Sequence, residues 1–434
     1  MSDFQPPTPS LGVPSFREFV LSSLKVGCLG FGGPAGQIAL MHREWVDDKK
    51  WIDEPRYLHA LSYCTLLPGP EAQQLATYIG WLLHGVRGGL VAGLLFVLPG
   101  AVLVTALAWL YAVHGDQPWL MAAFWGVKAA VLALVAEALQ RVGKRALKGR
   151  TDLVVAILAF VALAVFSAPF PLVILAAALA GLIGSRGVAR PAAAPQTPVP
   201  LTRTLGTAAL WLVIWLTPLV AVVLTLGHGH WLSRVGEVFA ALAAVTFGGA
   251  YAMLAWLQQQ AVEVQGWLTT AQMIDGLGLA ETTPGPLVLV NGFVGFMAGW
   301  KNGGWVWGLA GAGMALWQTF APSFLYIFAG APYAERLRQS PAATGLLRAV
   351  TAAVLGVIGS LALWFALHVV FTGAAMVATP WGGRMSVPVW GSFDLWALVL
   401  AVAAGVALIR FHVNVMVVIV GCAVVGLLKW AVGF

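Results

Sequence analysis

The stretch Leu67-Pro-Gly-Pro-Glu-Ala-Gln-Gln74 decides the fold, because its Pro-Gly-Pro turn returns 216 positions later as Pro284-Gly285-Pro286 (284 − 68 = 216). A second motif, Phe31-Gly32-Gly33, returns at the same offset as Phe247-Gly248-Gly249 (247 − 31 = 216). Two motifs that share one displacement predict two homologous halves. Gly and Pro interrupt apolar segments at matching places, a pattern typical of secondary transporters, which bind substrate where broken helices meet.

The composition excludes an ordinary soluble protein. The 434 residues are 60% hydrophobic and 9% charged, whereas soluble chains carry about 25% charged residues. Uncharged runs such as 90–112 and 208–226 are close to the length of a membrane-spanning helix. We therefore expect an all-α polytopic membrane protein. The net charge of +7 lies mostly in short loops beside helix ends, so it indicates orientation in the bilayer and not nucleic acid binding.

The repeats and the composition divide the chain into four parts. Residues 1–184 form the N-terminal repeat, 185–203 a Pro-rich cytoplasmic linker, 204–234 a connecting transmembrane span and 235–434 the C-terminal repeat. Helical segments are expected near 16–31, 55–67, 70–84, 88–113, 119–140, 152–168, 171–184, 205–226, 235–248, 270–283, 286–299, 304–329, 344–371, 394–409 and 412–430.

The second repeat is expected to have inverted topology. The span 205–226 has no counterpart in the first half, and one added crossing reverses the copy that follows it. The loop 141–150 carries five Lys or Arg residues and is predicted to be cytoplasmic. The loop with Arg336 and Arg338 should also be cytoplasmic, while its first-half counterpart, 114–118, has no Lys or Arg. The N-terminus is therefore predicted inside and the C-terminus outside.

Each Pro-Gly-Pro motif interrupts an apolar segment and starts a new helix, at Glu71 and at Leu287. The first N–H groups of a helix have no partner within it, and the helix N-terminus carries roughly half a positive charge. Such an end suits an oxyanion. We predict that the two ends bind one anion near the membrane midplane. The alternative, that these prolines are ordinary kinks packed against neighbours, stays open.

Lys128 lies about nine residues into the span 119–140. A charged side chain at that depth costs about 3 kcal/mol on insertion scales, so it should face the interior of the helix bundle. We interpret Lys128 as a cation for an anionic substrate. A structural ion pair with Glu137 or Glu71 is the alternative.

Two acids beside the motifs are candidates for coupling protons. Glu71 follows the first Pro-Gly-Pro, where it either complements the helix dipole or carries a proton. Glu281 precedes the second motif, and it is a membrane-embedded acid like Asp275, hence a proton-relay candidate. Residues 36–56 read as an interfacial amphipathic stretch anchored by Trp side chains.

These motifs resemble those of the chromate ion transporter family. Phe31–Ile38, His42–Glu44 and Leu67–Trp81 are similar to its N-half signatures, and Gly278–Pro286 is similar to its C-half signature. The resemblance covers nearly the whole chain. It implies a long-chain, two-domain member in the bacterial inner membrane that exports chromate with the proton motive force, with sulfate as a competing oxyanion and chromate resistance as the result.

The resemblance also implies functional residues. In the first copy they are Phe31, Gly32, Gly33, Pro34, His42, Arg43, Pro68, Gly69, Pro70, Glu71, Gln73 and Gln74. We add Lys128 and, from the second copy, Phe247, Gly248, Gly249, Thr283, Pro284, Gly285 and Pro286 as predicted binding residues, with Glu71 and Glu281 as the predicted proton-coupling acids. The second copy departs from the pattern, since Ala250 replaces Pro34 and the pair Gln258-Gln259 replaces His42-Arg43.

Two other functions remain open. One is a transporter of sulfate or another tetrahedral oxyanion, for which chromate is a mimic. The other is an integral-membrane enzyme, which should show an intramembrane His/Cys/Asp cluster or a cofactor motif, and the sequence has neither. We expect no catalytic residue, no metal and no cofactor. The sequence leaves a homodimer open.

Overall fold

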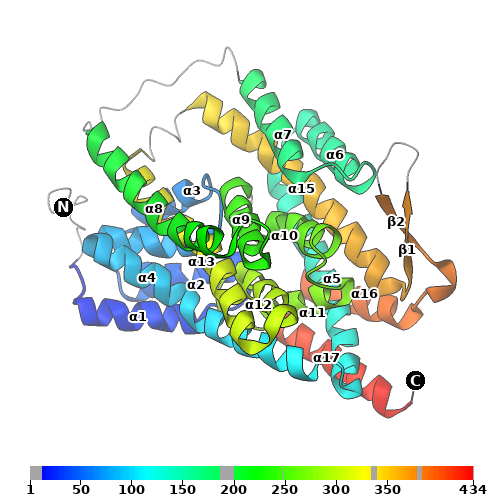
Figure 1. Cartoon of the computed structure of the whole chain (residues 1–434). Helices are drawn as coiled ribbons and strands as arrows, with labels where there is room; N and C mark the ends of the chain where they lie inside the picture. Colours follow the sequence, from blue (N-terminus) through cyan, green and yellow to red (C-terminus); the bar gives the residue numbers. More distant parts are fainter. Residues whose placement is uncertain (1–11, 186–199, 248, 334–339, 379–383, 434) are drawn as a thin grey trace. The chain divides into compact units, whose positions relative to one another are not determined.

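The computed structural model describes residues 12–185, 200–247, 249–333, 340–378 and 384–433 (Figure 1). This part of the chain is helical except for one two-stranded hairpin. It forms two compact units, each built from three separate stretches of sequence. The first unit contains Met1–Trp109, Arg190–Ala250 and Thr283–Ser340, and the second contains Leu110–Ala189, Tyr251–Thr282 and Pro341–Phe434.

The first unit contains all four copies of the duplicated motifs. Its elements are α1 (Phe16–Leu29), α2 (Gly33–His42), the π-helical turn η1 (Arg43–Asp48), α3 (Glu54–Cys64), α4 (Glu71–His114) as far as Trp109, α8 (Leu201–Leu226), α9 (Trp231–Val245), the short 3₁₀ turn η3 (Leu287–Leu289), α12 (Val290–Gly303), α13 (Trp305–Gly330) and η4 (Ala331–Tyr333). Helix α13 packs against α12, α8 and α9 (Figure 1).

A glycine breaks the long apolar helix in each copy. In α4 the backbone leaves helical geometry at His84 and at Gly85, which has φ 62° and ψ −153°. In the second copy Gly304, with φ 74° and ψ −152°, separates α12 from α13. Positive φ is unstrained only for glycine, so the two residues fix where each helix ends. The break predicted between 84 and 88 is confirmed.

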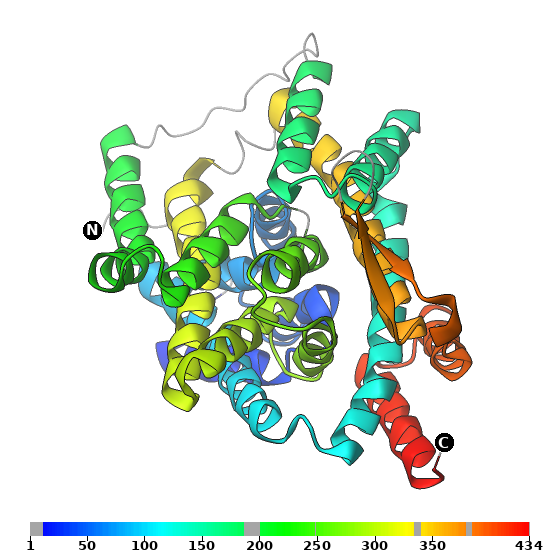
Figure 2. The ribbon, with the colours of Figure 1, turned by 45° about the vertical axis from the view of Figure 1, so that its right-hand side comes forward.

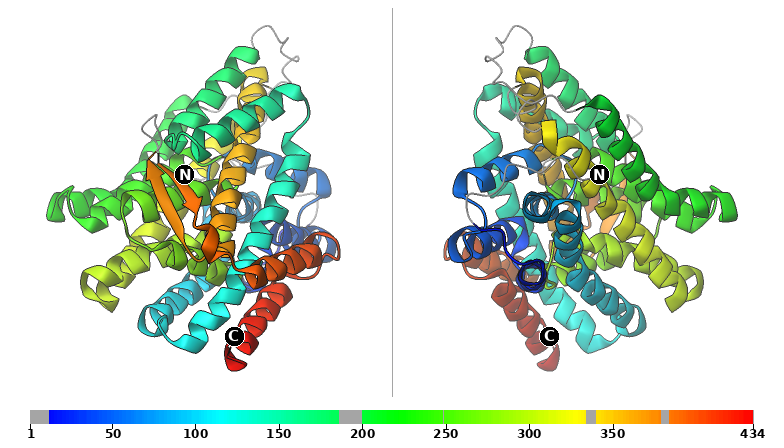
Figure 3. Two further views of the ribbon diagram at one scale, coloured as in Figure 1. Left: turned by 90° about the vertical axis from the view of Figure 1, so that its right-hand side faces the viewer. Right: turned by 90° about the vertical axis from the view of Figure 1, so that its left-hand side faces the viewer.

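The second unit is built around two long helices. Its elements are the end of α4, α5 (Pro118–Ala146), α6 (Arg150–Ala164), α7 (Phe170–Gly184), α10 (Ala250–Gln258) from Tyr251, the π-helical turn η2 (Gln259–Val264), α11 (Thr270–Glu281), α15 (Pro341–Val370), β1 (Ala374–Ala378), β2 (Arg384–Pro388), η5 (Trp390–Ser392), α16 (Leu395–Ile409) and α17 (Val415–Ala431). Helices α6 and α7 lie along α15 (Figure 2). Helices α16 and α17 pack on α5 (Figure 3).

Small residues allow these helices to approach closely. A Cβ built on Gly126 of α5 would overlap the carbonyl of Cys422 in α17, and one built on Gly426 of α17 would overlap the carbonyl of Ala122. The same contact recurs where Gly356 of α15 meets Ala156 of α6. Membrane helices use such small residues because van der Waals packing, and not burial from water, holds them together.

The apolar surface fits a lipid environment. Among the described residues, four helices are long and apolar enough to cross a membrane: Glu71–His114, Pro118–Ala146, Leu201–Leu226 and Pro341–Val370. Large apolar side chains lie on the outside, for example Leu224, which is 80% exposed. Exposed apolar area on this scale is typical of contact with lipid. The chain is a multi-pass membrane protein, as predicted.

Local structure repeats at the offset found in the sequence. The π-helical turns η1 and η2 start and end exactly 216 positions apart (259 − 43 and 264 − 48). Each turn is closed by one matching backbone hydrogen bond, from Lys49 to Glu44 and from Gln265 to Gln260. The two segments therefore fold alike. The inverted orientation of the repeats stays a prediction.

Several features were not predicted. The hairpin pairs β1 with β2 antiparallel, from Ala374 opposite Pro388 to Ala378 opposite Arg384, so the all-α expectation holds except here. Residues 36–48 and 250–264, expected to be outside the spanning helices, are helical. Most of the predicted linker, Gly248, and the loop with Arg336 and Arg338 lie outside the described residues.

Candidate functional site

Two backbone hydrogen bonds cross between the copies at the duplicated motifs. The N–H of Gly69, in the first Pro-Gly-Pro, donates to the carbonyl of Thr246 at 2.9 Å. The N–H of Gly285, in the second, donates to the carbonyl of Gly30 at 2.9 Å. Thr246 and Gly30 directly precede the two Phe-Gly-Gly motifs and are themselves 216 positions apart. Each Pro-Gly-Pro turn is thus hydrogen-bonded to the residue that precedes the Phe-Gly-Gly motif of the other copy. Such a reciprocal pair of contacts is what a local two-fold relation produces.

The turns share one backbone conformation. Gly69 has φ 100° and Gly285 has φ 97°, in the region where a side chain would be strained. Helix α4 starts directly after the first turn, with the N–H of Gln74 donating to the carbonyl of Pro70. After the second turn the N–H of Leu289 donates to the carbonyl of Pro286 within the 3₁₀ turn η3. The helix predicted to start at Leu287 therefore begins as a 3₁₀ turn, and α12 starts at Val290. The N–H groups between each proline and the donor of its bond are the ones that find no acceptor within the helix.

The Phe-Gly-Gly motifs are also non-helical. Gly32 and Gly33 have φ 85° and 67°, and Gly249 has φ 97°. Pro34 lies in the first turn of α2, where its missing N–H costs nothing. Phe31 is exposed at 36%. These residues therefore interrupt the helical backbone next to the carbonyls that accept the crossed hydrogen bonds.

Buried glutamines reinforce the turns. Gln74 donates from Nε2 to the carbonyl of Pro68 at 2.6 Å, and Gln73 donates to that of Phe320 at 3.5 Å. Both are at most 1% exposed, so they support the backbone from within. In the second copy Pro284, Gly285, Pro286 and Thr283, which is 3% exposed, are buried as well.

Gln37 is a residue that the sequence reasoning missed. Its Nε2 donates to the carbonyl of Gly285 at 2.5 Å and to that of Gly30 at 3.2 Å, so one fully buried amide bridges the two breaks. Because both partners are acceptors, the amide orientation is fixed and Oε1 is left buried without a hydrogen bond. The available signal was a glutamine in the apolar stretch after Gly-Gly, at a position where the second copy has Met253.

The positive charge of His42 is already compensated. Its Nε2 is hydrogen-bonded to Glu54, and its Nδ1 lies 3.2 Å from Asp47. The hydrogen bond to Glu54 raises the pKa of His42 above its ordinary value, despite partial burial. Arg43, the first residue of η1, is exposed.

In the second unit, Lys128 forms an ion pair. Its Nζ lies 3.4 Å from Oδ1 of Asp275, whose Oδ2 accepts a hydrogen bond of 2.8 Å from the Tyr111 hydroxyl. The side chains of Lys128 and Asp275 are 24% and 7% exposed. The partner is Asp275, whereas the sequence pointed to Glu137 or Glu71. Glu137 is instead hydrogen-bonded to Arg141.

The two predicted coupling acids lie in different units. Glu281, at the end of α11 in the second unit, accepts a hydrogen bond of 3.0 Å from the Tyr251 hydroxyl. Glu137 and Arg141 are its charged neighbours. Glu71 is the first residue of α4 in the first unit and is partly buried.

Replacing Lys128 by Gln should destabilise the protein, because the carboxylate of Asp275 would remain buried without its cation. Breaking a buried pair in this way costs about 3–5 kcal/mol. We expect a lower melting temperature in detergent, largely restored when Asp275→Asn is added. Lys144→Gln, at an exposed position of the same helix, is the control and should melt like wild type. A Lys128→Gln protein with unchanged stability would show that the pair contributes nothing.

Comparison with known proteins supplies the family. The sequence model of the chromate transporter family matches residues 17–182 and 233–427. A chromate transport protein of Cupriavidus metallidurans is 30% identical over 431 residues, covering 96% of this chain and 94% of the relative. One from Pseudomonas aeruginosa is 34% identical over 352 residues, covering 80% of each chain. No solved structure shows a significant match. The resemblance seen in the motifs is confirmed, and the chain belongs to the chromate transporter family.

Proposed function

We propose that this protein exports chromate across the bacterial inner membrane, driven by the proton motive force, and thereby confers chromate resistance. Its relatives are named chromate transport proteins, and the similarity to one of them extends over almost the whole of both chains. The observation that carries the mechanism is the pair of crossed hydrogen bonds, since it holds the two Pro-Gly-Pro turns by matching contacts.

The proposed binding groups are the backbone N–H donors that follow Pro70 and Pro286, together with the opened backbone at Gly32-Gly33 and Gly249. Oriented N–H groups at a helix start favour an anion without requiring a charged side chain. Two helix ends supply together about one positive charge, which is less than a dianion requires. Arg43, in the same unit as these groups, is a candidate for the remaining charge. The role of Lys128 as a cation for the substrate is proposed separately and assumes nothing about how the two units are placed.

Sulfate is the second candidate substrate. Chromate and sulfate are both tetrahedral dianions, and backbone N–H groups recognise the oxygen atoms of either. The binding groups proposed here therefore leave a sulfate transporter, with chromate as a mimic, as the alternative that a competition experiment decides.

Proton coupling is assigned to a partly buried carboxylic acid beside a duplicated motif. Glu281 directly precedes the second Pro-Gly-Pro motif in the sequence and is hydrogen-bonded by Tyr251. An acid within a membrane helix is a functional-site hypothesis by default. Glu71, at the start of α4, is the other candidate.

The inverted arrangement is supported by the crossed hydrogen bonds and by the loop charges. Reporter fusions after Arg145 and after Arg338 should both report the cytoplasm, because the positive loops of the two copies lie at different places in the repeat. A fusion after Gly115 is the control and should report the opposite side. Reporters on different sides after Arg145 and Arg338 would rule out the inversion.

Everted membrane vesicles test the transport function directly. Energised vesicles should take up labelled chromate, an uncoupler should abolish the uptake, and excess sulfate should compete. Gly285→Leu or Gly69→Leu should lower the rate at least about tenfold, because a side chain at φ near 100° distorts the turn that starts the helix. Gly421→Ala, which meets open space, is the matched control. Uptake by Gly69→Leu and Gly285→Leu at the wild-type rate would exclude these turns as the binding site.

Glu281→Gln should uncouple chromate transport from the proton gradient. The amide retains a hydrogen-bond acceptor for Tyr251 but cannot carry a proton, so chromate binding should be preserved while uptake no longer responds to an imposed pH gradient. Equilibrium binding of labelled chromate and uptake at two gradients separate the effects. Glu18→Gln, at an exposed position, should behave like wild type. Unchanged gradient dependence in Glu281→Gln would transfer the role to another acid, with Glu71 next to be tested.

A further inference from the structure

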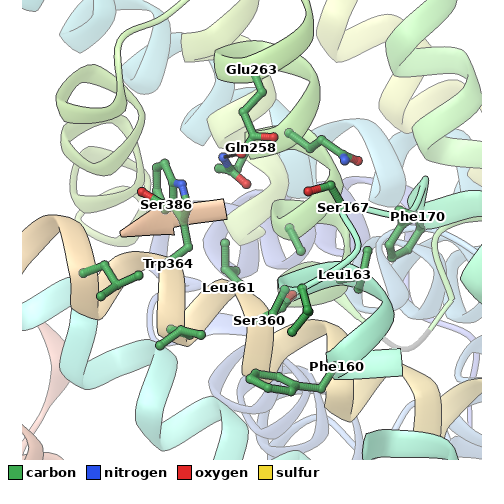
Figure 4. Close-up of a pocket in the computed structure, with 16 residues that line it drawn as sticks. Phe160, Leu163, Ser167, Phe170, Gln258, Glu263, Ser360, Leu361, Trp364 and Ser386 are labelled. Carbon is green, nitrogen blue, oxygen red and sulfur yellow. Dashed lines mark hydrogen bonds between the residues drawn. The ribbon is translucent and has the colours of Figure 1, made fainter. Parts of the chain in front are cut away.

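The second unit contains a cavity that the transport proposal does not use. Its volume is about 190 Å³, and it is lined by α6, α7, α10, η2, α15 and β2 (Figure 4). Glu263, Gln258 and Ser167 occupy one side of it, and apolar side chains including Leu163, Leu361 and Phe160 occupy the other. The cavity is therefore amphipathic, with a carboxylate at its polar side.

The charge of this cavity is unsuited to an anion. Among the described residues that line it, there is no Lys, Arg or His. Within the described part of the chain Glu263 forms no ion pair, and it accepts one hydrogen bond of 2.7 Å, from Nε2 of Gln258. His368, which interacts electrostatically with Glu263, is hydrogen-bonded to the Trp364 carbonyl and to Ser386. Among the described lining residues, the charge that a chromate or sulfate ion would meet is the negative charge of Glu263.

Glu263 is exposed, and the first copy shows a different partner for the corresponding carboxylate. At the offset of 216, Glu263 corresponds to Asp47 and Gln258 to His42. In the first copy the imidazole of His42 lies 3.2 Å from Asp47 across the π-helical turn η1. In the second copy an uncharged amide makes the same contact across η2. Both copies thus have an acid at this position, in contact with a histidine in the first copy and with a glutamine in the second.

We propose that this cavity binds a primary ammonium group carried on a short alkyl chain. Glu263 would accept N–H donors of the ammonium, and the carboxamides of Gln258 and Gln259 and the hydroxyl of Ser167 provide further acceptors. The alkyl part would contact Leu361 and Leu163. A volume of about 190 Å³ admits a group of a few heavy atoms, and it is smaller than the roughly 300–1,000 Å³ of drug-sized sites.

Two sources could supply this chemistry: a free small alkylamine, or the headgroup of an aminophospholipid. The protein is a membrane protein, so both reach it. The proposal does not rest on chromate transport, and chromate should not compete for the site.

Binding of labelled ethanolamine to the purified full-length chain tests the proposal. We expect saturable binding that falls about tenfold or more in Glu263→Gln, as expected for losing a hydrogen bond to a charged group. Glu18→Gln should bind like wild type. Tetramethylammonium, a cation without N–H donors, should not compete. Binding that is indifferent to Glu263→Gln, or equal competition by tetramethylammonium, would overturn the proposal.

A second variant supplies the missing internal cation. Gln258→His places an imidazole opposite Glu263, as His42 stands opposite Asp47, and should displace ethanolamine while the protein keeps its melting temperature. Native mass spectrometry from nanodiscs then identifies the source. Retention of phosphatidylethanolamine, but not phosphatidylcholine, by wild type and its loss in Glu263→Gln would assign the lipid headgroup, and ethanolamine binding alone would assign a free amine. If neither ligand binds in a Glu263-dependent way, the cavity is not an ammonium site.

Discussion

The structure depends on one constraint: backbone N–H and C=O groups inside a membrane protein must find partners, each costing several kcal/mol if left unpaired. A helix broken by Pro-Gly-Pro releases such groups in the middle of an apolar segment. Here the N–H groups of Gly69 and Gly285 are satisfied by carbonyls of the opposite copy, at Thr246 and Gly30. The breaks therefore require each other.

The same constraint explains what the sequence predicts well. Gly and Pro dictate backbone conformation locally, so the breaks at Gly85, Gly69 and Gly285 and most helix limits follow from the chain alone. Side-chain contacts that tertiary packing brings about do not follow from the sequence in this way. Asp275 lies 147 residues from Lys128, and nothing in the spacing favours it over Glu137 (275 − 128 = 147). Gln37 was missed for the same reason, since its two acceptors come from opposite copies.

The copies share a backbone frame but differ in their side chains. The π-helical turns, the glycine conformations and the crossed hydrogen bonds repeat. The side chains differ, since Gln37 corresponds in sequence to Met253 and His42 corresponds to Gln258. A symmetric frame pairs backbone groups equally on both sides. Because the side chains differ, one copy pairs its acids with a basic side chain of its own. The other copy places an uncharged amide beside its acid. Duplication followed by divergence at polar positions thus gives two chemical environments on one backbone design.

The distribution of charge limits how selective the proposed anion site is. His42 is occupied by Glu54 and Asp47, and Lys128 is occupied by Asp275. His42 and Lys128, two of the three cations that sequence reasoning assigned to substrate, are therefore largely neutralised within the protein, and the remaining donors are Arg43 and backbone N–H groups. Such donors fix position and number of oxygen atoms, but they respond weakly to which element lies at the centre of a tetrahedral dianion. The proposed site is therefore expected to discriminate only weakly between chromate and sulfate.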